Sequence, residues 1–537
     1  MASNPLESAD GHYDVIVVGA GAGGIYAVQR FARQGLSVIG IESGSGVGGV
    51  WFHNRYPGAR VDVDSVEYSY QFSYELASKW NWTERNAAQA ELIAYLEFAT
   101  DLFGVRDKFR FSTRVTSARW NPVDCQWQVE TDQGLHVSSR FLVMASGNLS
   151  SSRLPQFPGL ETFKGECFLT SHWPREDIDL TGRRVGVIGT GSSGVQVATA
   201  LSAMVQHLCV FQRTANYSVP AQSFPLDPEL QRQRAERLSK ERAILLTRPA
   251  GTAVVRAKHP MSHYTEAERI TQMERQWDRG GQGMSAVFSD QGVDLASNTA
   301  ISDFVRRKIH QTVTNRSVAD SLASQPYPIG TRRLILDTGY YQIFNQDNVT
   351  LVDVREDPLI EITTRGIRTG GQQFDLDVIV FALGFRAFSG ALVDAGIRNE
   401  DGLGFDESWS RGPRTLLGLM CSDFPNLFFP TGAGSPSVLA NMILLNELHA
   451  DWIGDTISYL DQHGYRSIVP TRAAEDQWCE HVAEVAAPLL RLKVDNYMVH
   501  VNTDGSRVFM PYAAGLDRYL PQAEEVTASG YKGFQLS

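Results

Sequence analysis

Residues 13–24 read Tyr-Asp-Val-Ile-Val-Val-Gly-Ala-Gly-Ala-Gly-Gly, a nearly continuous apolar run followed at once by a glycine loop. Such an apolar run is typical of a buried parallel strand. A helical pattern occupies residues 25–34, and a second apolar run over residues 37–41 ends at Glu42. Strand, glycine loop, helix and strand within about 30 residues predict a βαβ unit that binds a dinucleotide.

The same arrangement recurs further along the chain. An apolar strand over residues 184–188 precedes Gly-Thr-Gly-Ser-Ser-Gly at 189–194, and a helical pattern and a strand over 207–211 follow. In such a loop the first glycine permits the turn, the second lets the backbone approach a pyrophosphate, and the third lets helix and strand pack closely. An ordinary glycine-rich turn is the alternative, which the strand before and the helix after each loop disfavour. The candidate residues are Gly19, Gly21 and Gly24 in the first loop and Gly189, Gly191, Ser192, Ser193 and Gly194 in the second.

The residue that ends each second strand indicates which nucleotide binds. Glu42 ends the first unit, and a carboxylate there accepts hydrogen bonds from ribose hydroxyls and repels a 2′-phosphate, which suits FAD or NAD. The second unit has Arg213 and Thr214 instead. A guanidinium with a hydroxyl suits the 2′-phosphate of NADP, so this unit favours NADP over NAD.

The composition excludes several classes of function. The 537 residues carry 49 Lys and Arg against 60 Asp and Glu, a net charge of −11, which argues against a nucleic-acid or membrane surface. The five cysteines are scattered without a C-x-x-C pair, so we expect no zinc ribbon, no dithiol acceptor and a reducing, cytoplasmic location. A nicotinamide that reduces a flavin then leaves O2 as the electron acceptor, which predicts a flavin monooxygenase or oxidase.

We expect an α/β fold with two Rossmann-like dinucleotide-binding domains and a helical insertion in the second. The FAD-binding domain is expected to be split into residues 1–148 and 385–537. The NADP-binding domain then spans 149–384, with the insertion at about 221–325. Apolar strands over 140–147 and 376–384 are each expected to close a sheet and carry the chain between the domains. We read the uncharged run 424–445, which is interrupted by Pro and Gly, as a buried strand, turn and helix, with helix from about 437 to 463.

Three longer motifs resemble the signatures of type I Baeyer–Villiger monooxygenases, which are FAD- and NADPH-dependent class B flavoprotein monooxygenases. Residues 48–62 read Gly-Gly-Val-Trp-Phe-His-Asn-Arg-Tyr-Pro-Gly-Ala-Arg-Val-Asp and match one signature throughout its fixed positions. Residues 163–174, Phe-Lys-Gly-Glu-Cys-Phe-Leu-Thr-Ser-His-Trp-Pro, match a second one except that Leu169 replaces the usual His. Residues 327–333, Tyr-Pro-Ile-Gly-Thr-Arg-Arg, are similar to the loop that carries the family's catalytic Arg. Asn496 stands near a position where the family often has Trp.

The resemblance implies a Baeyer–Villiger oxidation. In that reaction NADPH reduces FAD, O2 adds at C4a of the flavin, and the deprotonated peroxide attacks a ketone, giving an ester or lactone. It makes Arg333 and Asp62 the catalytic pair, with Asp62 holding Arg333 near the flavin. It places Gly49, Trp51, Asp62 and Tyr68 beside the cofactor, Arg332 with Arg213 and Thr214 on the 2′-phosphate, and Met442 and Ser437 at the substrate.

Two alternatives stay open. A related flavin monooxygenase that oxidises sulfur or nitrogen uses the protonated hydroperoxide and does not require Arg333. A catalytically silent nucleotide-binding redox sensor is suggested by Leu169. In the leading interpretation the partners are a small-molecule ketone of unspecified size and O2, with no metal, nucleic acid or membrane, and the protein is a monomer or a weak homo-oligomer.

Overall fold

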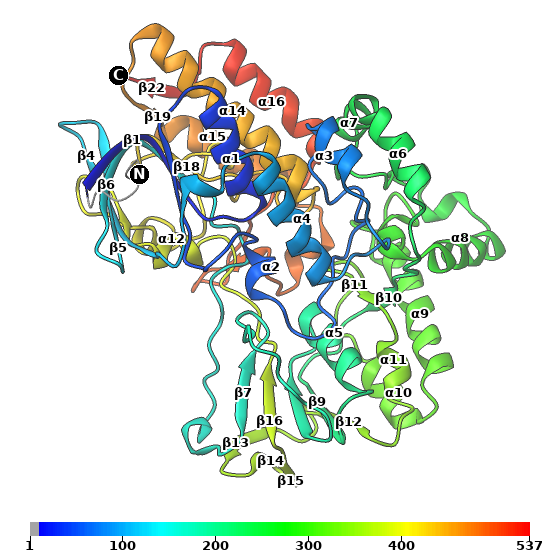
Figure 1. Ribbon diagram of the computed structural model, residues 1–537. Coiled ribbons are helices and arrows are strands. Elements are labelled where there is room, and N and C mark those ends of the chain that lie inside the picture. Colours follow the sequence, from blue (N-terminus) through cyan, green and yellow to red (C-terminus); the bar gives the residue numbers. More distant parts are fainter. Residues whose placement is uncertain (1–9) are drawn as a thin grey trace.

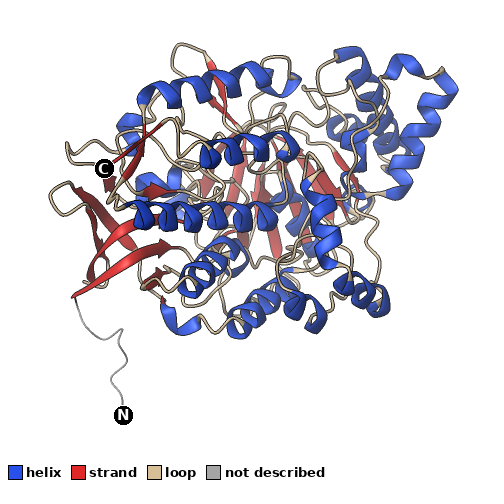
Figure 2. Ribbon diagram, turned by 90° about the horizontal axis from the view of Figure 1, so that it is seen from above, coloured by secondary structure: helices blue, strands red, loops and turns tan. Residues whose placement is uncertain are grey.

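The computed structural model describes residues 10–537, so the first nine residues of the expected FAD-binding domain lie outside the described part. Two lobes are visible in Figure 1, a larger one that contains both ends of the described chain and a smaller one below it. Viewed from above, helices cover both sides of a central sheet (Figure 2). The expected α/β class is confirmed.

The larger lobe is built on a sheet with the strand order β17-β4-β5-β6-β1-β2-β3, and β18 also pairs with β6. β1 pairs with β2 and β6 in parallel, as the buried apolar runs predicted. The strands are β1 (Asp10–Val18), β2 (Val38–Ile41), β3 (Phe109–Arg110), β4 (Val115–Asn121), β5 (Gln126–Thr131), β6 (His136–Met144), β17 (Ile397–Arg398) and β18 (Leu427–Phe428). Segments that precede and segments that follow the smaller lobe in the sequence therefore belong to one sheet.

The helices of this lobe come from both ends of the sequence. The early ones are α1 (Ala22–Arg33), α2 (Val50–His53), α3 (Tyr74–Lys79) and α4 (Gln89–Leu102). The late elements are α12 (Gly390–Asp394), α13 (Phe405–Ser408), α14 (Met442–His463), β19 (Ile468–Pro470), α15 (Arg472–Ala486), the short helix η5 (Leu490–Lys493), β20 (Val499–Val501), β21 (Arg507–Phe509), α16 (Leu516–Ala528) and β22 (Phe534–Leu536).

The smaller lobe holds a parallel sheet with the order β12-β9-β8-β16-β7. Its strands are β7 (Glu166–Leu169), β8 (Arg184–Ile188), β9 (His207–Gln212), β12 (Val349–Asp353) and β16 (Val378–Phe381). The small sheets beside it are β10 (Ser218–Pro220) with β11 (Ile335–Asp337), and β13 (Leu359–Thr363), β14 (Gly366–Thr369) and β15 (Gln373–Asp375). Its main helix is α5 (Ser192–Leu201), and α11 (Tyr340–Ile343) packs on it.

The helical insertion contains α6 (Pro228–Glu236), α7 (Leu238–Leu246), α8 (Glu266–Arg279), α9 (Leu295–Thr312) and α10 (Arg316–Leu322). The insertion also reaches the larger lobe, since α3 packs on α6. Arg242 of α7 contacts the fully buried carboxyl group of Glu447 of α14, with 3.3 Å between Nη2 and Oε2.

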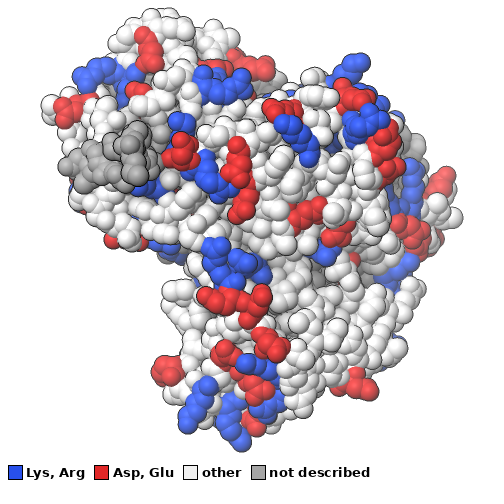
Figure 3. Space-filling model, viewed as in Figure 1, with Lys and Arg blue, Asp and Glu red and all other residues white. Residues whose placement is uncertain are grey.

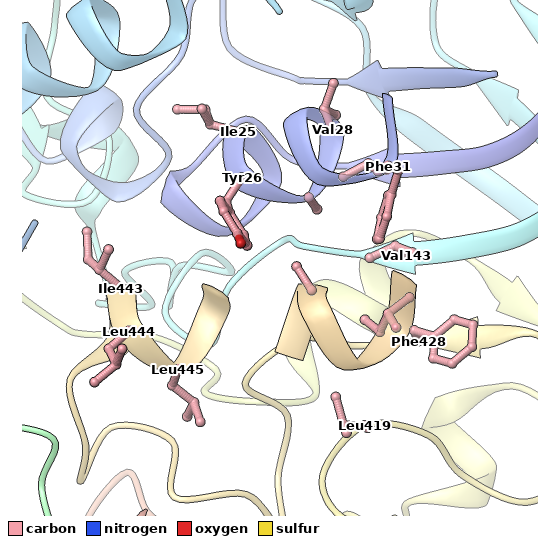
Figure 4. Close-up of a cluster of buried hydrophobic side chains, with 14 of the residues drawn as sticks. Ile25, Tyr26, Val28, Phe31, Val143, Leu419, Phe428, Ile443, Leu444 and Leu445 are labelled. Carbon is pink, nitrogen blue, oxygen red and sulfur yellow. The ribbon is translucent and has the colours of Figure 1, made fainter. Parts of the chain in front are cut away.

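The core of the larger lobe lies between α1 and α14, and Figure 4 shows the apolar side chains that meet there. Ile25, Val28 and Phe31 of α1 have no exposed surface. Along one edge, the Tyr26 hydroxyl donates to Asp451 of α14 at 2.8 Å. Truncation of one such buried side chain to Ala costs about 2–5 kcal/mol, so the packing of α14 on α1 contributes to the stability of the first dinucleotide fold.

Two local expectations were wrong. The strands over residues 140–147 and 376–384 do not close their sheets, because β6 lies between β5 and β1 and β16 lies between β8 and β7. The helix expected from residue 437 begins at Met442, because Val438 has a left-handed backbone (φ 55°) and the Asn441 side chain caps the helix by accepting from the N–H groups of Ile443 and Leu444.

The run 424–445 forms β18, a turn and the start of α14, as expected. Within residues 10–537, no helix is both long enough and apolar enough to cross a membrane. On the face seen in Figure 3, Lys and Arg alternate with Asp and Glu, and the surface is indented between the lobes.

Candidate active site

The two glycine loops have nearly the same conformation. Gly19 and Gly189 both have positive φ, at 110° and 108°, which a side chain would strain. Gly21 and Gly191, at the N-terminal ends of α1 and α5, both have an extended backbone with φ of −74°. The free N–H groups of each first helical turn face a loop of the type that binds phosphate.

The remaining glycines show what each loop can accommodate. A Cβ on Gly24 would lie 1.8 Å from the Gly19 carbonyl oxygen, and one on Gly194 would lie 2.0 Å from that of Gly189. A Cβ on Gly191 would meet nothing within 4 Å, so the space beside this residue at the N-terminal end of α5 is open. The third glycine of each loop thus serves helix packing and Gly191 leaves room for a ligand, which fits a dinucleotide.

The residues expected to read the ribose lie at the ends of β2 and β9. Glu42 is buried and accepts from the N–H groups of Ala20 at 2.7 Å and Gly44 at 2.6 Å. The Ser43 hydroxyl also donates to Oε1 of Glu42 at 3.2 Å, whereas Oε2 has the Ala20 N–H as its donor and a second lone pair that can accept from a ribose hydroxyl. Arg213 is exposed directly after β9, and the Thr190 hydroxyl donates to the Thr214 carbonyl at 2.9 Å.

Arg333 and Asp62 form a bidentate ion pair across 271 residues of sequence. Nε and Nη2 of Arg333 donate to the two Asp62 oxygens, both at 2.7 Å. Burial by itself would lower the pKa of Arg333, but the Asp62 charge raises it above its ordinary value, so the guanidinium stays protonated. The third nitrogen, Nη1, donates to the Val438 carbonyl at 3.3 Å. The structure therefore joins one residue from each glycine-loop fold to the substrate-side loop, residues 435–442.

The substrate-side loop is held in a strained shape. Val438 is β-branched yet has a φ of 55°, a conformation that costs about 1–3 kcal/mol and persists only where the surroundings impose it. Asn148 donates to the Ser437 hydroxyl at 2.6 Å and to the Thr431 carbonyl at 2.8 Å. The Val438 N–H contacts the Met442 sulfur at 3.2 Å. Ser437 is fully buried in this arrangement, and its hydroxyl takes part in the contacts that shape the loop.

The flavin-side candidates gather near the first loop. A Cβ on Gly49 would lie 2.8 Å from the Gly21 Cα, so these two backbones lie in close contact. Trp51 Nε1 donates to the Tyr68 hydroxyl at 3.1 Å, and their rings meet edge to face. Burial raises the pKa of Tyr68 to about 12, which keeps the phenol protonated. Trp51 and Tyr68 thus lie in contact, and Gly49 lies against the first glycine loop.

The positions that depart from the family signatures have local partners. Asn496 donates to the carbonyls of Arg491 and Val494 and accepts from the Met498 N–H, so its side chain shapes a turn. Leu169 ends β7 and packs on the apolar core of the second sheet. His172 lies with Nδ1 3.1 Å from the Ser152 hydroxyl, at the segment that links the lobes.

Three polar residues of the site gave no signal in the sequence. Gln282 of the insertion donates to the carbonyls of Asp62 (3.2 Å) and Leu334 (3.4 Å), and so holds both sides of the ion pair. Asn216 donates to the Thr190 carbonyl at 2.6 Å and bonds the Tyr327 hydroxyl. Asn148 is the third. Each contact joins residues more than 25 positions apart without any local pattern, so the spacing of residues in one sequence does not reveal it.

Two dinucleotide folds with an arginine–carboxylate pair that joins them define a two-nucleotide flavoprotein of the monooxygenase class. Residues 12–241 match the family described as flavin-binding monooxygenase-like. The chain is 36% identical to a Baeyer–Villiger monooxygenase of Pseudooceanicola batsensis, over 97% of this chain and 95% of the relative. It is 35% identical to a phenazine N-monooxygenase of Lysobacter antibioticus, over 98% and 97%.

A solved structure of an oxidised steroid monooxygenase bound to NADP superimposes with a TM-score of 0.93 at 44% identity, over 98% of this chain and 99% of that one. The chain belongs to the Baeyer–Villiger monooxygenases of the flavin-binding monooxygenase-like family. The resemblance inferred from the three motifs is confirmed.

Proposed function

We propose that the protein uses NADPH and O2 to convert ketones to esters or lactones, with FAD as its bound cofactor. The observation that carries this proposal is the bidentate Arg333–Asp62 pair next to the substrate-side loop. Transfer of oxygen to a ketone places negative charge on oxygen, and a guanidinium is the side chain that stays protonated beside it. FAD supplies the activated oxygen when it is bound and reduced.

The chain's own residues bind and orient the reactants. The first loop and Glu42 hold FAD, with Gly49, Trp51 and Tyr68 beside it. The second loop holds NADPH, with Arg213, Thr214 and Arg332 on its 2′-phosphate. Arg332 suits that role because its guanidinium is held in place, 4.5 Å from the centre of the Tyr327 ring and with Nε donating to the Asp495 carbonyl. Met442 and Ser437 shape the ketone pocket.

The test compares Arg333→Ala with Arg316→Ala in the FAD-bound enzyme. Arg316 is the control because its side chain is 88% exposed on α10. We expect Arg333→Ala to lower kcat for ester formation by about 10²–10³-fold, the usual effect of removing one group that stabilises a developing oxyanion. NADPH should still reduce the flavin, and Arg316→Ala should match the wild type. Unchanged ester formation in Arg333→Ala would show that the proposed role of Arg333 is wrong.

Oxidation of nitrogen is the second candidate, because the phenazine N-monooxygenase is as similar to this chain as the Baeyer–Villiger relative is. Such a reaction does not need a permanent cation at Arg333. A screen of cyclic, linear, aryl and steroid ketones against amines and sulfides separates the two. If amines react and ketones do not, and Arg333→Ala leaves amine oxidation intact, the second function replaces the first. If neither ketones nor amines and sulfides make the protein consume NADPH faster, the protein would instead be the silent sensor.

We also propose the division into residues 1–148, 149–384 and 385–537, with the insertion at about 221–325. The pairing of β17 with β4 and of β18 with β6 supports a split first domain. A cytoplasmic location and a monomeric or weakly associating state complete the proposal. Cell fractionation and light scattering test these two points.

A further inference from the structure

A second arginine holds the loop that carries Arg333. Arg491 of η5 donates through Nε and Nη2 to the carbonyl of Gly330, at 3.1 and 2.7 Å. Gly330 lies three residues before Arg333 in the arginine loop, residues 327–333, and has a φ of 77°. Two nitrogens of the planar Arg491 guanidinium thus bind the same Gly330 carbonyl, which leaves the turn at Gly330 little freedom to rotate.

The contact belongs to a larger clamp. The segment 490–498 faces the arginine loop at its other end as well, where Arg332 Nε donates to the Asp495 carbonyl at 3.0 Å. The Leu490 N–H donates to the Gly292 carbonyl of the insertion at 3.0 Å. Asn496 fixes the turn between these points. The C-terminal segment therefore sets where the arginine loop lies.

The charge of Arg491 is not cancelled. Within residues 10–537, no carboxylate lies within ion-pair distance of it, whereas Arg333 has Asp62. Burial, with repulsion from Arg333 as a smaller cause, lowers the pKa of Arg491, and the nearby Tyr497 opposes this. Of these two neighbouring guanidinium groups, only that of Arg333 has a carboxylate partner. A half-buried cation without a counter-charge costs folding free energy, so its presence at this place calls for a functional explanation.

We propose that Arg491 is a positioning residue that fixes the arginine loop and leaves the pocket beside Arg333 with one uncancelled positive charge. This role rests on the proposed function. The pocket then favours a ligand with a negatively charged oxygen over its neutral analogue. It gains that preference from a residue outside the three motifs.

The test uses Arg491→Lys, which keeps the charge without the fork, and Arg491→Met, which keeps neither. Arg507→Gln is the control, because Arg507 pairs with the exposed Asp495 in the same part of the chain. The first measurement is the thermal protection of the oxidised FAD enzyme by cyclohexanecarboxylate. We expect wild type and Arg507→Gln to bind it equally. Arg491→Lys should bind it at most threefold more weakly, and Arg491→Met about tenfold more weakly.

The second measurement is the yield of ester per NADPH consumed, at saturating ketone. We expect the yield to fall in the order wild type, Arg491→Lys, Arg491→Met, while the anaerobic rate of flavin reduction by NADPH stays unchanged. Equal carboxylate affinity in wild type and Arg491→Met overturns the inference. A wild type that oxidises no ketone overturns the proposed function instead, and the carboxylate measurement still decides the role of Arg491. If Arg491→Met does not fold, Arg491→Lys alone decides. The inference then requires that this variant bind cyclohexanecarboxylate within threefold of wild type and form less ester per NADPH consumed.

Discussion

Two alanine substitutions in the second glycine loop should have opposite effects. In Gly194→Ala the new Cβ would lie 2.0 Å from the Gly189 carbonyl oxygen, a backbone atom that cannot move without shifting β8 or α5. Overpacking of this kind costs about 1–3 kcal/mol. In Gly191→Ala the Cβ meets nothing within 4 Å, and a φ of −74° suits alanine, so the free energy of unfolding should change by less than about 0.5 kcal/mol. Only the dinucleotide would meet that methyl group.

The assay pairs thermal unfolding with NADPH titration in the FAD-bound protein. For a domain of this size, about 2 kcal/mol lowers Tm by roughly 4–8 °C, which we expect for Gly194→Ala. Gly191→Ala should keep the wild-type Tm while its Kd for NADPH rises at least about tenfold, or 1.4 kcal/mol. A stable Gly194→Ala, or a Gly191→Ala that binds NADPH normally, would refute the division of labour between the two glycines.

Two further predictions concern a buried acid and the cofactor choice. Burial raises the pKa of Glu447 to about 8, despite Arg242 and the Gln71 N–H at 2.6 Å. The native state therefore holds a proton that the unfolded chain releases near pH 4.5, and this contribution to stability is present at low pH and lost as pH rises toward 8. It amounts to at most about 5 kcal/mol. Urea unfolding at pH 5.5 and 8.5 should show a smaller loss of stability in Glu447→Gln than in wild type, and equal losses would contradict the assignment. Arg213→Ala should lower kcat/KM for NADPH about 10–100-fold and leave that for NADH within about twofold, which steady-state kinetics with both coenzymes checks. An equal loss with both coenzymes would argue against a phosphate contact.

Local pattern was sufficient for the elements that carry the nucleotide loops. An apolar strand, a glycine turn and a helix form from neighbouring residues, and the structure has β1–α1–β2 and β8–α5–β9 where the patterns placed them. The start of α14 was placed five residues early because the apolar pattern continues through residues 437–441. The left-handed Val438 and the cap at Asn441 are features that periodicity does not report.

The chemistry of the site was only partly accessible from the sequence. Asp62 and Arg333 were paired through the family motifs, and the structure contains the ion pair between them. Gln282, Asn148 and Arg491 were missed because each acts on a backbone carbonyl or hydroxyl far away in the chain. A backbone partner leaves no complementary residue type in the sequence, so composition and spacing could not reveal these contacts.

The packing of α1 on α14 has a consequence for synthesis on the ribosome. The apolar face of α1 emerges early, yet the helix that covers it begins at Met442, about 400 residues later. At about 5–20 residues per second, that interval lasts roughly 20–80 s. All strands of the second sheet, β7 to β16, are made within it. The nascent chain can therefore complete the second nucleotide fold first. The first nucleotide fold exposes apolar surface until α14 is made, and it is the part that most needs a chaperone.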